Sequence, residues 1–374
     1  MHSPSPSIYA LVAGLCFSAS VPFAKVLGSE TTPLMLAAVF LLGSAIGTTG
    51  YTVFLNLCGQ KRSSVEAPLM RGDLPWLFAA TLFGSLLPTL LVVYGVAATT
   101  ATTASFLFSF EGPTTVLVAC LLFREAVGRR IWTAVVCITC SCLIMSLGDQ
   151  KDFGLHVSYG AVCILLACFS WGIANNCIRM ISGVDPNHQT LVRSGVGGLV
   201  LCGLALASGD VFPSIFVFLC AVVCGFISYG GLASIFFVYG VRGLGSARAT
   251  TYFSINPLFG IVLSTVLFQI LPGVTLWIAL PFLLLGMWLL LTEVHQHVHV
   301  HEALIHEHRH QHQDMHHDSA THVHGPGDPE LDRFGYHSHL HKHEPVTHSH
   351  PHHPDLHHWH EHMKRKGGSG AGRR

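Results

Sequence analysis

Histidine is the residue type with the most evident chemistry in this chain, and it is concentrated near one end. Of the 27 histidines, 24 lie between His295 and His362. They recur as His-x-His in HQHVHVH at 295–301, HEHRHQH at 306–312 and HSHLHKH at 337–343. Imidazole is a good ligand for nickel, cobalt, zinc and copper, and it is largely neutral near pH 7. The tract therefore predicts binding of one of these metals.

The candidate metal ligands are the following histidines of this tract: His295, His297, His299, His301, His306, His308, His310, His312, His337, His339, His341, His343, His348, His350, His357, His358, His360 and His362. Successive residues of an extended chain face opposite sides, so the alternation does not predict one preformed cage. HGPGDPE interrupts the tract, and few apolar residues are available for a core. We therefore expect a disordered tail. Physiological metal binding and a polar tail that binds metals only in vitro are the two interpretations.

Glu111 is the one acidic side chain that falls well inside an apolar run. A charge near the middle of a bilayer costs about 2.5–3.5 kcal/mol on insertion scales, so an acid there indicates function. Protonation would remove this cost, and a proton exchanged in step with a solute would couple the two movements. The alternative is a carboxyl kept neutral, or paired with Lys25, for packing alone.

Five further side chains are candidates for contact with a solute. Lys25 lies late in the first apolar run, where it extends to the interface, anchors a substrate or pairs with the acid. Trp171 and Asn175 are four residues apart and share a helix face, which suits a pocket or hydrogen bonds between helices. Tyr94 and Tyr239 fit a central cavity or the aromatic belts at the membrane interfaces.

Ten apolar runs must position these side chains. The chain has 374 residues, of which 50% are hydrophobic and 11% charged, and its mean hydropathy is +0.51. Each run approaches the ~20 residues that cross a bilayer as a helix. The runs are 8–27, 33–55, 74–97, 102–123, 131–147, 158–181, 189–207, 213–241, 247–267 and 274–291. The eighth run is long, which predicts tilt or a loop at its start.

Lysine and arginine in the loops predict the orientation, because positive loops stay in the cytoplasm. With the N-terminus inside, the outer loops hold only Lys151. The inner loops then hold Lys61, Arg62, Arg71, Arg124, Arg129, Arg130, Arg179, Arg193, Arg242 and Arg248. The distribution predicts a multi-pass protein of the inner membrane with both termini, and hence the tail, in the cytoplasm.

Two stretches of the membrane body match without a gap at an offset of 145 residues. VVYGVAATTATTASFLFSFEGPTTVLVACLLFRE (92–125) aligns with FVYGVRGLGSARATTYFSINPLFGIVLSTVLFQI (237–270). Five spans per copy is an odd number, so the second copy enters the membrane with the opposite topology. Inverted repeats are typical of secondary transporters, whose site lies near the midplane between the repeats. Pro113 and Pro257 predict helix kinks at corresponding places, and Asn256 stands where the first copy has its acid.

At these residues the chain resembles the drug/metabolite transporter superfamily in its ten-helix EamA form. ASFLFSFEGPTTVLVACLLFRE and VYGVRGLGSARATTYFSINPLFGIVLSTVLFQ carry the resemblance, which covers about residues 8–292. The family pattern is a small-residue start, Ser-Leu-Glu-Pro, an apolar run and Gly-Glu. The first copy has Glu111-Gly112-Pro113 instead, and the second has Asn256-Pro257 and ends in Gln269-Ile270. The resemblance implies transport of a small organic solute, often export, and the departures argue against coupling that needs two acids.

The sequence thus predicts an all-α polytopic membrane protein with repeats over 8–148 and 156–292 and a tail over 293–374. The leading function is secondary active transport of a small solute, in the direction of export and without a cofactor. The alternatives are transport of nickel, cobalt or zinc, and a membrane-anchored metal buffer or sensor. The expected partners are the lipid bilayer and the solute or metal ion, not nucleic acid, and a homodimer is left open. No Walker-type motif, HExxH or paired intramembrane acid supports an enzyme.

Overall fold

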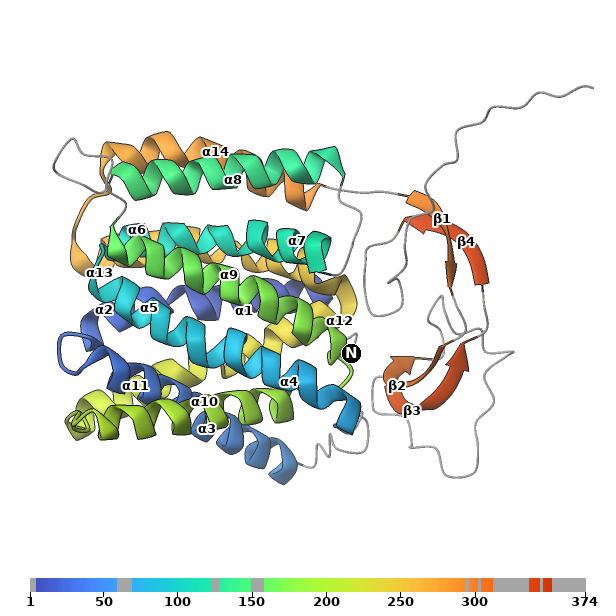
Figure 1. Ribbon diagram of the computed structural model, residues 1–374, viewed down its shortest axis with the longest axis horizontal. Helices are drawn as coiled ribbons and strands as arrows, with labels where there is room; N and C mark the ends of the chain where they lie inside the picture. Colours follow the sequence, from blue (N-terminus) through green and yellow to red (C-terminus); the bar gives the residue numbers. More distant parts are fainter. Residues whose placement is uncertain are drawn as a thin grey trace, which may run out of the picture.

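A bundle of α-helices forms the body of the protein. The computed structural model describes residues 5–58, 69–122, 128–148, 158–292, 296–301, 304–311, 336–343 and 346–351. The helix axes run roughly side by side, and the N-terminus lies at the same end of the bundle as the last residues of α14 (Figure 1).

The described residues of this body form ten helical spans, as the apolar runs predict. Nine spans among the described residues are long and apolar enough to cross a membrane, and the tenth, Val274–Leu290, is slightly shorter. Lipid offers no hydrogen-bond partner to a peptide group, so each span pairs its own backbone as a helix. The helices are α1 Pro6–Ser18, α2 Ser20–Leu27, α3 Pro33–Leu57, η2 Arg71–Asp73, α4 Leu74–Thr81, η3 Leu82–Leu86, α5 Leu87–Ala97, α6 Ala101–Leu107, η4 Phe108–Phe110, α7 Glu111–Leu122, α8 Arg129–Gly148, α9 Tyr159–Met180, α10 Pro186–Ala207, α11 Ile215–Ile227, α12 Leu232–Phe253, α13 Asn256–Phe268 and α14 Val274–Leu291.

The starts of α3 and α10 show how the local sequence fixes a helix end. Each has a proline in the first turn, Pro33 and Pro186, where a missing N–H costs nothing. The preceding residues, Thr32 and Asp185, accept a hydrogen bond from a backbone N–H of the first turn through their side chains. These two helices are the second span of each repeat, so the two copies begin it in the same way.

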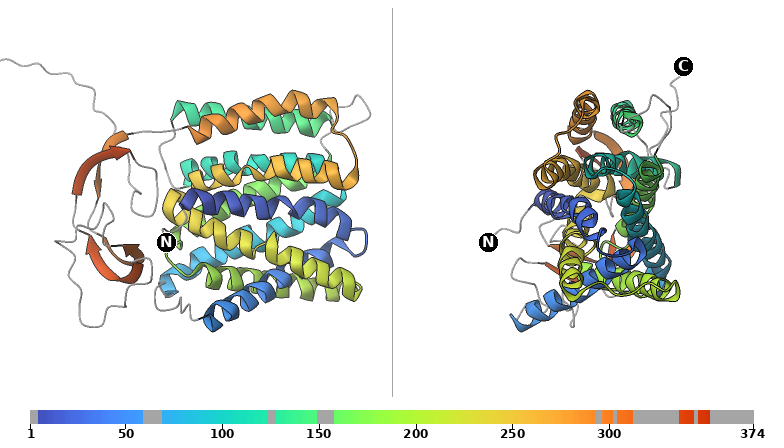
Figure 2. Two further views of the ribbon diagram at one scale, coloured as in Figure 1. Left: turned by 180° about the vertical axis from the view of Figure 1, so that it is seen from behind. Right: turned by 90° about the vertical axis from the view of Figure 1, so that its left-hand side faces the viewer.

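The packing of the helices follows the inverted repeat. α3 lies against α10, α6 against α13 and α8 against α14, so three spans each contact their own counterpart. α1 packs on α12, and its counterpart α9 packs on α5 in the same way. α8 and α14 lie together at one edge of the bundle (Figures 1 and 2). A twofold axis between the repeats produces both kinds of contact. A span on the axis packs against its own counterpart, and a contact between two other spans occurs a second time between their counterparts.

Small residues allow the closest helix contacts. A Cβ atom at Gly225 in α11 would lie 2.1 Å from the carbonyl oxygen of Phe40 in α3. A Cβ atom at Gly43 in α3 would lie 2.5 Å from the Cα atom of Val222 in α11. Such approaches are typical of helix pairs in membranes, where dispersion between closely packed helices replaces the hydrophobic effect.

Two spans of each repeat are interrupted at corresponding positions. In the third span, η3 is a π-helix over Leu82–Leu86, and the eighth span breaks at 228–231, between α11 and α12. In the fourth span, η4 is a 3-10 turn over Phe108–Phe110, and the ninth span turns at 254–255. An offset of 145 residues superposes both pairs to within one residue. The repeat in the sequence predicts the second pair through its prolines, whereas the first pair lies outside the matched stretches.

The described part of the tail differs from the disorder expected of residues 293–374. β1 Gln296–His301 pairs antiparallel with β4 Val346–Pro351, and β2 Leu304–Gln311 pairs antiparallel with β3 Tyr336–His343. The expectation of disorder rested on low apolar content, but the His-x-His alternation has the period of a β-strand, and valine and isoleucine between the histidines favour extended backbone. The strands lie beyond the end of the bundle that carries the N-terminus (Figure 1).

Candidate functional site

Glu111 lies near the middle of the bundle, as its sequence position predicts. It is the eleventh of 22 residues in the span Ala101–Leu122. Its side chain is 4% exposed. The Glu111 Oε1 atom accepts a hydrogen bond of 2.8 Å from Nδ2 of Asn175, which projects from α9. An acid of the first repeat and an amide of the second therefore meet where the repeats are packed together.

Hydroxyl groups complete the surroundings of this pair. Nδ2 of Asn175 lies 3.2 Å from Oγ1 of Thr115 and 3.4 Å from Oγ1 of Thr250. The Thr115 hydroxyl donates to the backbone carbonyl of Glu111 at 2.8 Å. The polar contacts join α7, α9 and α12, so the group at position 111 is linked to both repeats. Because Asn175 has several acceptors within reach, it can stay hydrogen-bonded if the carboxyl takes up a proton.

Trp171 packs against other aromatic rings inside the bundle, beside this network. It packs edge-on against Phe17 at 5.2 Å and against Phe108 at 5.4 Å between ring centroids. Phe17 also contacts Phe253, the repeat counterpart of Phe108, at 5.2 Å. Trp171 and Asn175 share a face of α9, as their spacing predicts, and both contact the fourth span. In this conformation aromatic rings fill the centre of the bundle.

Asn256 occupies the position of Glu111 in the second repeat and is 1% exposed. Its Nδ2 atom donates to the carbonyl oxygen of Phe253 at 3.2 Å, whereas Oδ1 has no hydrogen-bond partner in the part of the chain that the structure describes. Pro113 and Pro257 lie in the first turns of α7 and α13. Each proline therefore starts a helix after an interruption and removes no interior hydrogen bond.

Lys25 does not pair with Glu111. Its Nζ atom donates to the carbonyl oxygens of Val96 and Thr99 at 2.8 Å and of Ala97 at 3.3 Å. Glu111 lies 12 residues beyond Thr99 along the chain, which corresponds to roughly 18 Å of helix. Lys25 is thus placed at the C-terminal carbonyl groups of α5, where a cation is favourable.

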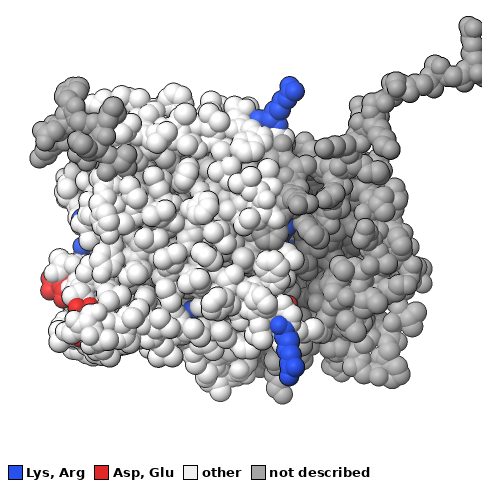
Figure 3. Space-filling view, viewed as in Figure 1, with Lys and Arg blue, Asp and Glu red and all other residues white. Residues whose placement is uncertain are grey.

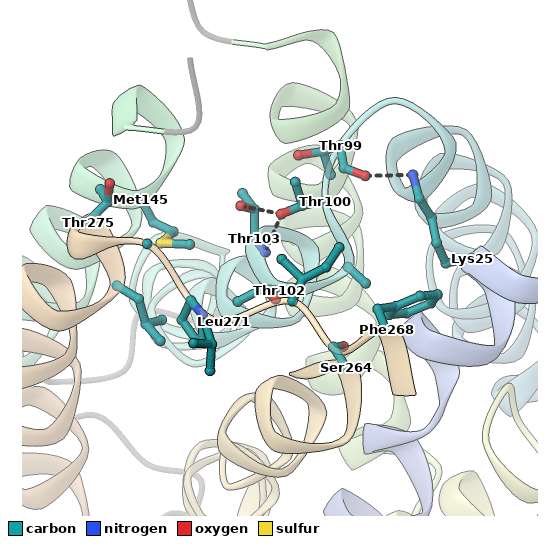
Figure 4. Close-up of a pocket in the computed structure, with 15 residues that line it drawn as sticks. Lys25, Thr99, Thr100, Thr102, Thr103, Met145, Ser264, Phe268, Leu271 and Thr275 are labelled. Atoms are coloured by element: carbon teal, nitrogen blue, oxygen red, sulfur yellow. Dashed lines mark hydrogen bonds between the residues drawn. The ribbon is translucent and has the colours of Figure 1, made fainter. Parts of the chain in front are cut away.

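Lys25 also lines a cavity of about 400 Å³. The cavity lies at the end of the bundle away from the termini, between the α5–α6 connection and the α13–α14 connection (Figure 4). Threonine side chains of the first connection and Leu271 of the second face it. Thr103 and Ser264 are among its lining residues, and Glu111 is not.

Tyr94 and Tyr239 have different surroundings although the repeat relates them. Tyr94 is 37% exposed. Tyr239 lies next to Tyr9, at 5.3 Å between ring centroids, and under the guanidinium of Arg242. Tyr94 lies near the end of the span Arg71–Ala97, and Tyr239 lies near the end of the span Ile215–Gly245. Because the two repeats are inverted, these positions lie toward opposite ends of the bundle, where aromatic belts lie.

Arg193 is a buried cation that the sequence reasoning placed with the inner loops. It is the eighth of 22 residues in α10 and is 5% exposed. Arg179, counted with the same loops, is 2% exposed in the last turn of α9. Both arginines lie inside apolar runs, 158–181 and 189–207, and this position was the available signal of burial.

The candidate metal ligands fall into two groups. No cluster of three or more His, Cys, Asp and Glu that could hold a metal ion occurs among the described residues. Within the strands, the backbone register places His297 opposite His350, and His308 opposite His339. The same register pairs His299 with His348, His306 with His341 and His310 with His337, while His301 and His343 face other residue types. His295, His312, His357, His358, His360 and His362 lie outside the described residues.

Comparison with known proteins agrees with this architecture. The profile of the EamA-like transporter family matches the chain twice, at residues 5–147 and 158–292. An uncharacterized transporter of Methanothermobacter thermautotrophicus is 24% identical over 287 residues, which cover 71% of this chain and 81% of that protein. A solved crystal structure superposes with a TM-score of 0.56 at 17% identity, over 76% of this chain and 95% of the other. This last likeness is one of fold.

Proposed function

The chain belongs to the EamA-like transporter family, and from that premise we propose that it is a secondary active transporter that exports a small solute across the inner membrane. The observation that supports this most directly is Glu111, a buried acid in the middle of a span, held by Asn175 where the two repeats meet. A buried acid at membrane depth is typical of a coupling site. The proposed cycle exchanges a proton at Glu111 as the repeats rock about the centre.

The proposed orientation puts both termini in the cytoplasm. Exposed arginines such as Arg71 and Arg129 lie at the end of the bundle that carries the termini, whereas exposed Glu30 lies at the other end. Figure 3 shows long basic side chains beside the tail, acidic atoms with a little basic surface at the far end, and a largely uncharged surface between them. This charge asymmetry supports a cytoplasmic tail. The cavity beside Lys25 then faces outward and serves as the exit vestibule.

Profiling of cells tests this function directly. Cells that express the full-length chain, Glu111→Gln and Glu30→Gln are compared for metabolites inside and in the medium. We expect at least one small solute to move outward with the full-length chain and with Glu30→Gln, and to stay at the level of empty cells with Glu111→Gln. Glu30 is the matched control because it is an exposed acid. Equal export by all three forms would contradict the role of Glu111.

We further propose that the tail binds a divalent metal beside the transport body. Directly opposed residues of an antiparallel pair share a face of the sheet, so the register gathers the histidines of β2 and β3 on one face. Imidazole groups on one face suit nickel, cobalt, zinc or copper.

Elemental analysis separates these two roles. The full-length chain is compared with a truncation after Leu291, with Glu111→Gln, and with His306, His308 and His310 all changed to Gln. We expect bound metal to fall with the truncation and the triple substitution and to be unchanged by Glu111→Gln. The matched control changes His316, His317 and His322, which lie outside the described residues. Loss of metal with Glu111→Gln would instead favour metal transport by the body.

A further inference from the structure

Arg193 is a cation held inside the bundle. It lies seven residues after the start of α10, which corresponds to about 10 Å of helix. Only 5% of its side chain is exposed. A guanidinium stays protonated in proteins, so burial does not remove the charge as it can for an acid. A buried charge is costly unless another group compensates it.

The side chain has little compensation from the chain itself. Nη1 of Arg193 donates to Oγ of Ser234 at 3.4 Å, which is long for such a bond. Its Nε atom has no hydrogen-bond partner. Over the described residues Arg193 forms no ion pair and no further hydrogen bond. Most of its five N–H groups are therefore unused.

Arg242 shows what a structural arginine looks like in the same bundle. Its Nε donates to the carbonyl of Ser182 at 2.8 Å, and Nη2 donates to the carbonyl of Val184 at 3.3 Å. Its guanidinium also covers the ring of Tyr239 at 5.4 Å. Arg242 joins the end of the eighth span to the α9–α10 connection. Arg193 has no such set of backbone acceptors, so fixing helices to each other does not account for it.

The surroundings of Arg193 are those of a binding site in a transporter. Its Nη2 atom lies 2.9 Å from the place that a Cβ atom of Gly84 would take, within the π-helix of the third span. Its one partner, Ser234, follows the break in the eighth span. The guanidinium thus lies between the two interruptions that the repeat relates. Paired helix interruptions mark the substrate site in inverted-repeat transporters.

Hydroxyl groups lie beside the partner of Arg193 and at the break in the eighth span. Thr190 Oγ1 lies 3.4 Å from Ser234 Oγ. Ser44 and Ser194 share a buried hydrogen bond of 2.8 Å, and a Cβ atom at Gly230 would lie 3.1 Å from the hydroxyl oxygen of each. The hydroxyl groups can donate hydrogen bonds to an oxygen acceptor. Because residue 230 is a glycine, the backbone at the break can lie close to Ser44 and Ser194.

We propose that Arg193 binds the carboxylate of a transported solute, and that the solutes are small organic monoanions. This deepens the transport function proposed above and rests on it. A planar guanidinium binds a carboxylate through two parallel hydrogen bonds. One carboxylate neutralises one guanidinium, whereas a phosphate dianion would leave a net negative charge in the bundle. The site is closed in this conformation, and hinging at the two interruptions gives access to it.

Thermal unfolding of the full-length chain in lipid nanodiscs tests the proposal. The probes are acetate, propionate and benzoate, each compared with its amide, and inorganic phosphate. We expect at least one carboxylate to raise Tm where its amide does not. Arg193→Met should lose this rise, and its Tm without a probe should be no lower than that of the natural chain, because a poorly compensated buried charge has been removed. Arg193→Lys should keep part of the rise.

Arg129→Gln is the matched control, because it removes an exposed arginine from the start of α8. It should respond to the carboxylate as the natural chain does. A rise that persists in Arg193→Met, a rise with phosphate alone, or equal responses to acids and amides would each overturn the proposal. Export that requires Glu111 but is insensitive to Arg193→Met would overturn the carboxylate site and leave the transport function in place.

Discussion

Glu111 and Asn256 occupy the same position in the two repeats, but their surroundings differ. The carboxyl of Glu111 receives a hydrogen bond of 2.8 Å from Asn175 of the other repeat. Asn256 reaches only the carbonyl of Phe253, and its Oδ1 atom has no partner among the described residues. The inverted repeat therefore duplicates the backbone geometry but not the chemistry. One half carries the acid, and the other carries the amide that holds it and the proposed anion site at Arg193.

The interruptions show the same contrast in the backbone. The third span keeps its helical course through a π-turn at Leu82–Leu86. The eighth span breaks at 228–231, where Gly230 has a φ of 142°. A π-turn changes the hydrogen-bond pattern within a helix, whereas the glycine break ends one helix and starts another. We expect the second repeat to supply the larger hinge.

The largest effect should come from Gly230→Val. A side chain at a positive φ costs about 1–3 kcal/mol, and the new Cβ atom would lie 3.1 Å from the hydroxyl oxygens of Ser44 and Ser194. We expect little folded protein, measured by size-exclusion chromatography in detergent and by Tm. Ser85→Ala, at the corresponding place in the first repeat, should leave both nearly unchanged. Equal effects of the two substitutions would remove the distinction between the interruptions.

The next largest effect should come from moving the acid between the repeats. The double variant Glu111→Gln with Asn256→Glu keeps the number of acids and the fold symmetry. We expect export to stay at the background of empty cells, because no described group donates to position 256 as Asn175 donates to position 111. The measurement is the metabolite profile, with folded yield as the control. Recovery of export would show that the repeats are interchangeable for coupling.

The sequence predicted the spans and the acid because each depends on local composition. An apolar run of sufficient length forms a helix in lipid whatever its neighbours are, and an acid inside such a run is conspicuous. The prolines at Pro113 and Pro257 likewise predicted one pair of interruptions. Asn175 was predicted as a pocket or packing residue, and its contact with Glu111 depends on how α7 and α9 pack, which spacing along one helix does not determine.

Arg193 and the break at 228–231 could not be predicted in the same way. Arg193 lies only four residues after the start of the apolar run 189–207, where a long cationic side chain can still extend to the interface, so the run alone does not show that the side chain is buried. The segment ISYGG at 227–231 is apolar and glycine-rich, and glycine is common inside membrane helices. The strands of the tail depend on pairing between residues 25 to 55 positions apart along the chain, which composition does not reveal.

A smaller effect should follow Asn175→Leu. Hydrogen bonds between membrane helices are worth about 0.6 kcal/mol on average and up to about 1.7, so Tm should fall slightly. Export should fall strongly although Tm changes little, because the carboxyl of Glu111 loses the hydrogen bond from Asn175. Asn176→Leu is the comparison, since Asn176 donates to the backbone carbonyls of Thr115 and Gly172. Asn176→Leu should lower Tm and leave export nearly unchanged, because the donor to Glu111 remains.

The smallest effect on export should come from Lys25→Met, which compares the α5–α6 connection with its counterpart in the second repeat. In the first repeat the helix ends at Ala97, and Lys25 donates to carbonyl groups there. In the second repeat α12 continues through the corresponding region, with one non-helical residue at Gly245.

A cation at a helix C-terminus contributes about 0.3–1 kcal/mol, and up to about 2 when partly buried. We therefore expect Lys25→Met to lower Tm by a few degrees and to leave export near that of the natural chain, measured side by side with Lys25→Arg. Loss of export with an unchanged Tm would instead make Lys25 a solute contact at the mouth of the cavity, and the first repeat would then bind solute as well as couple its movement.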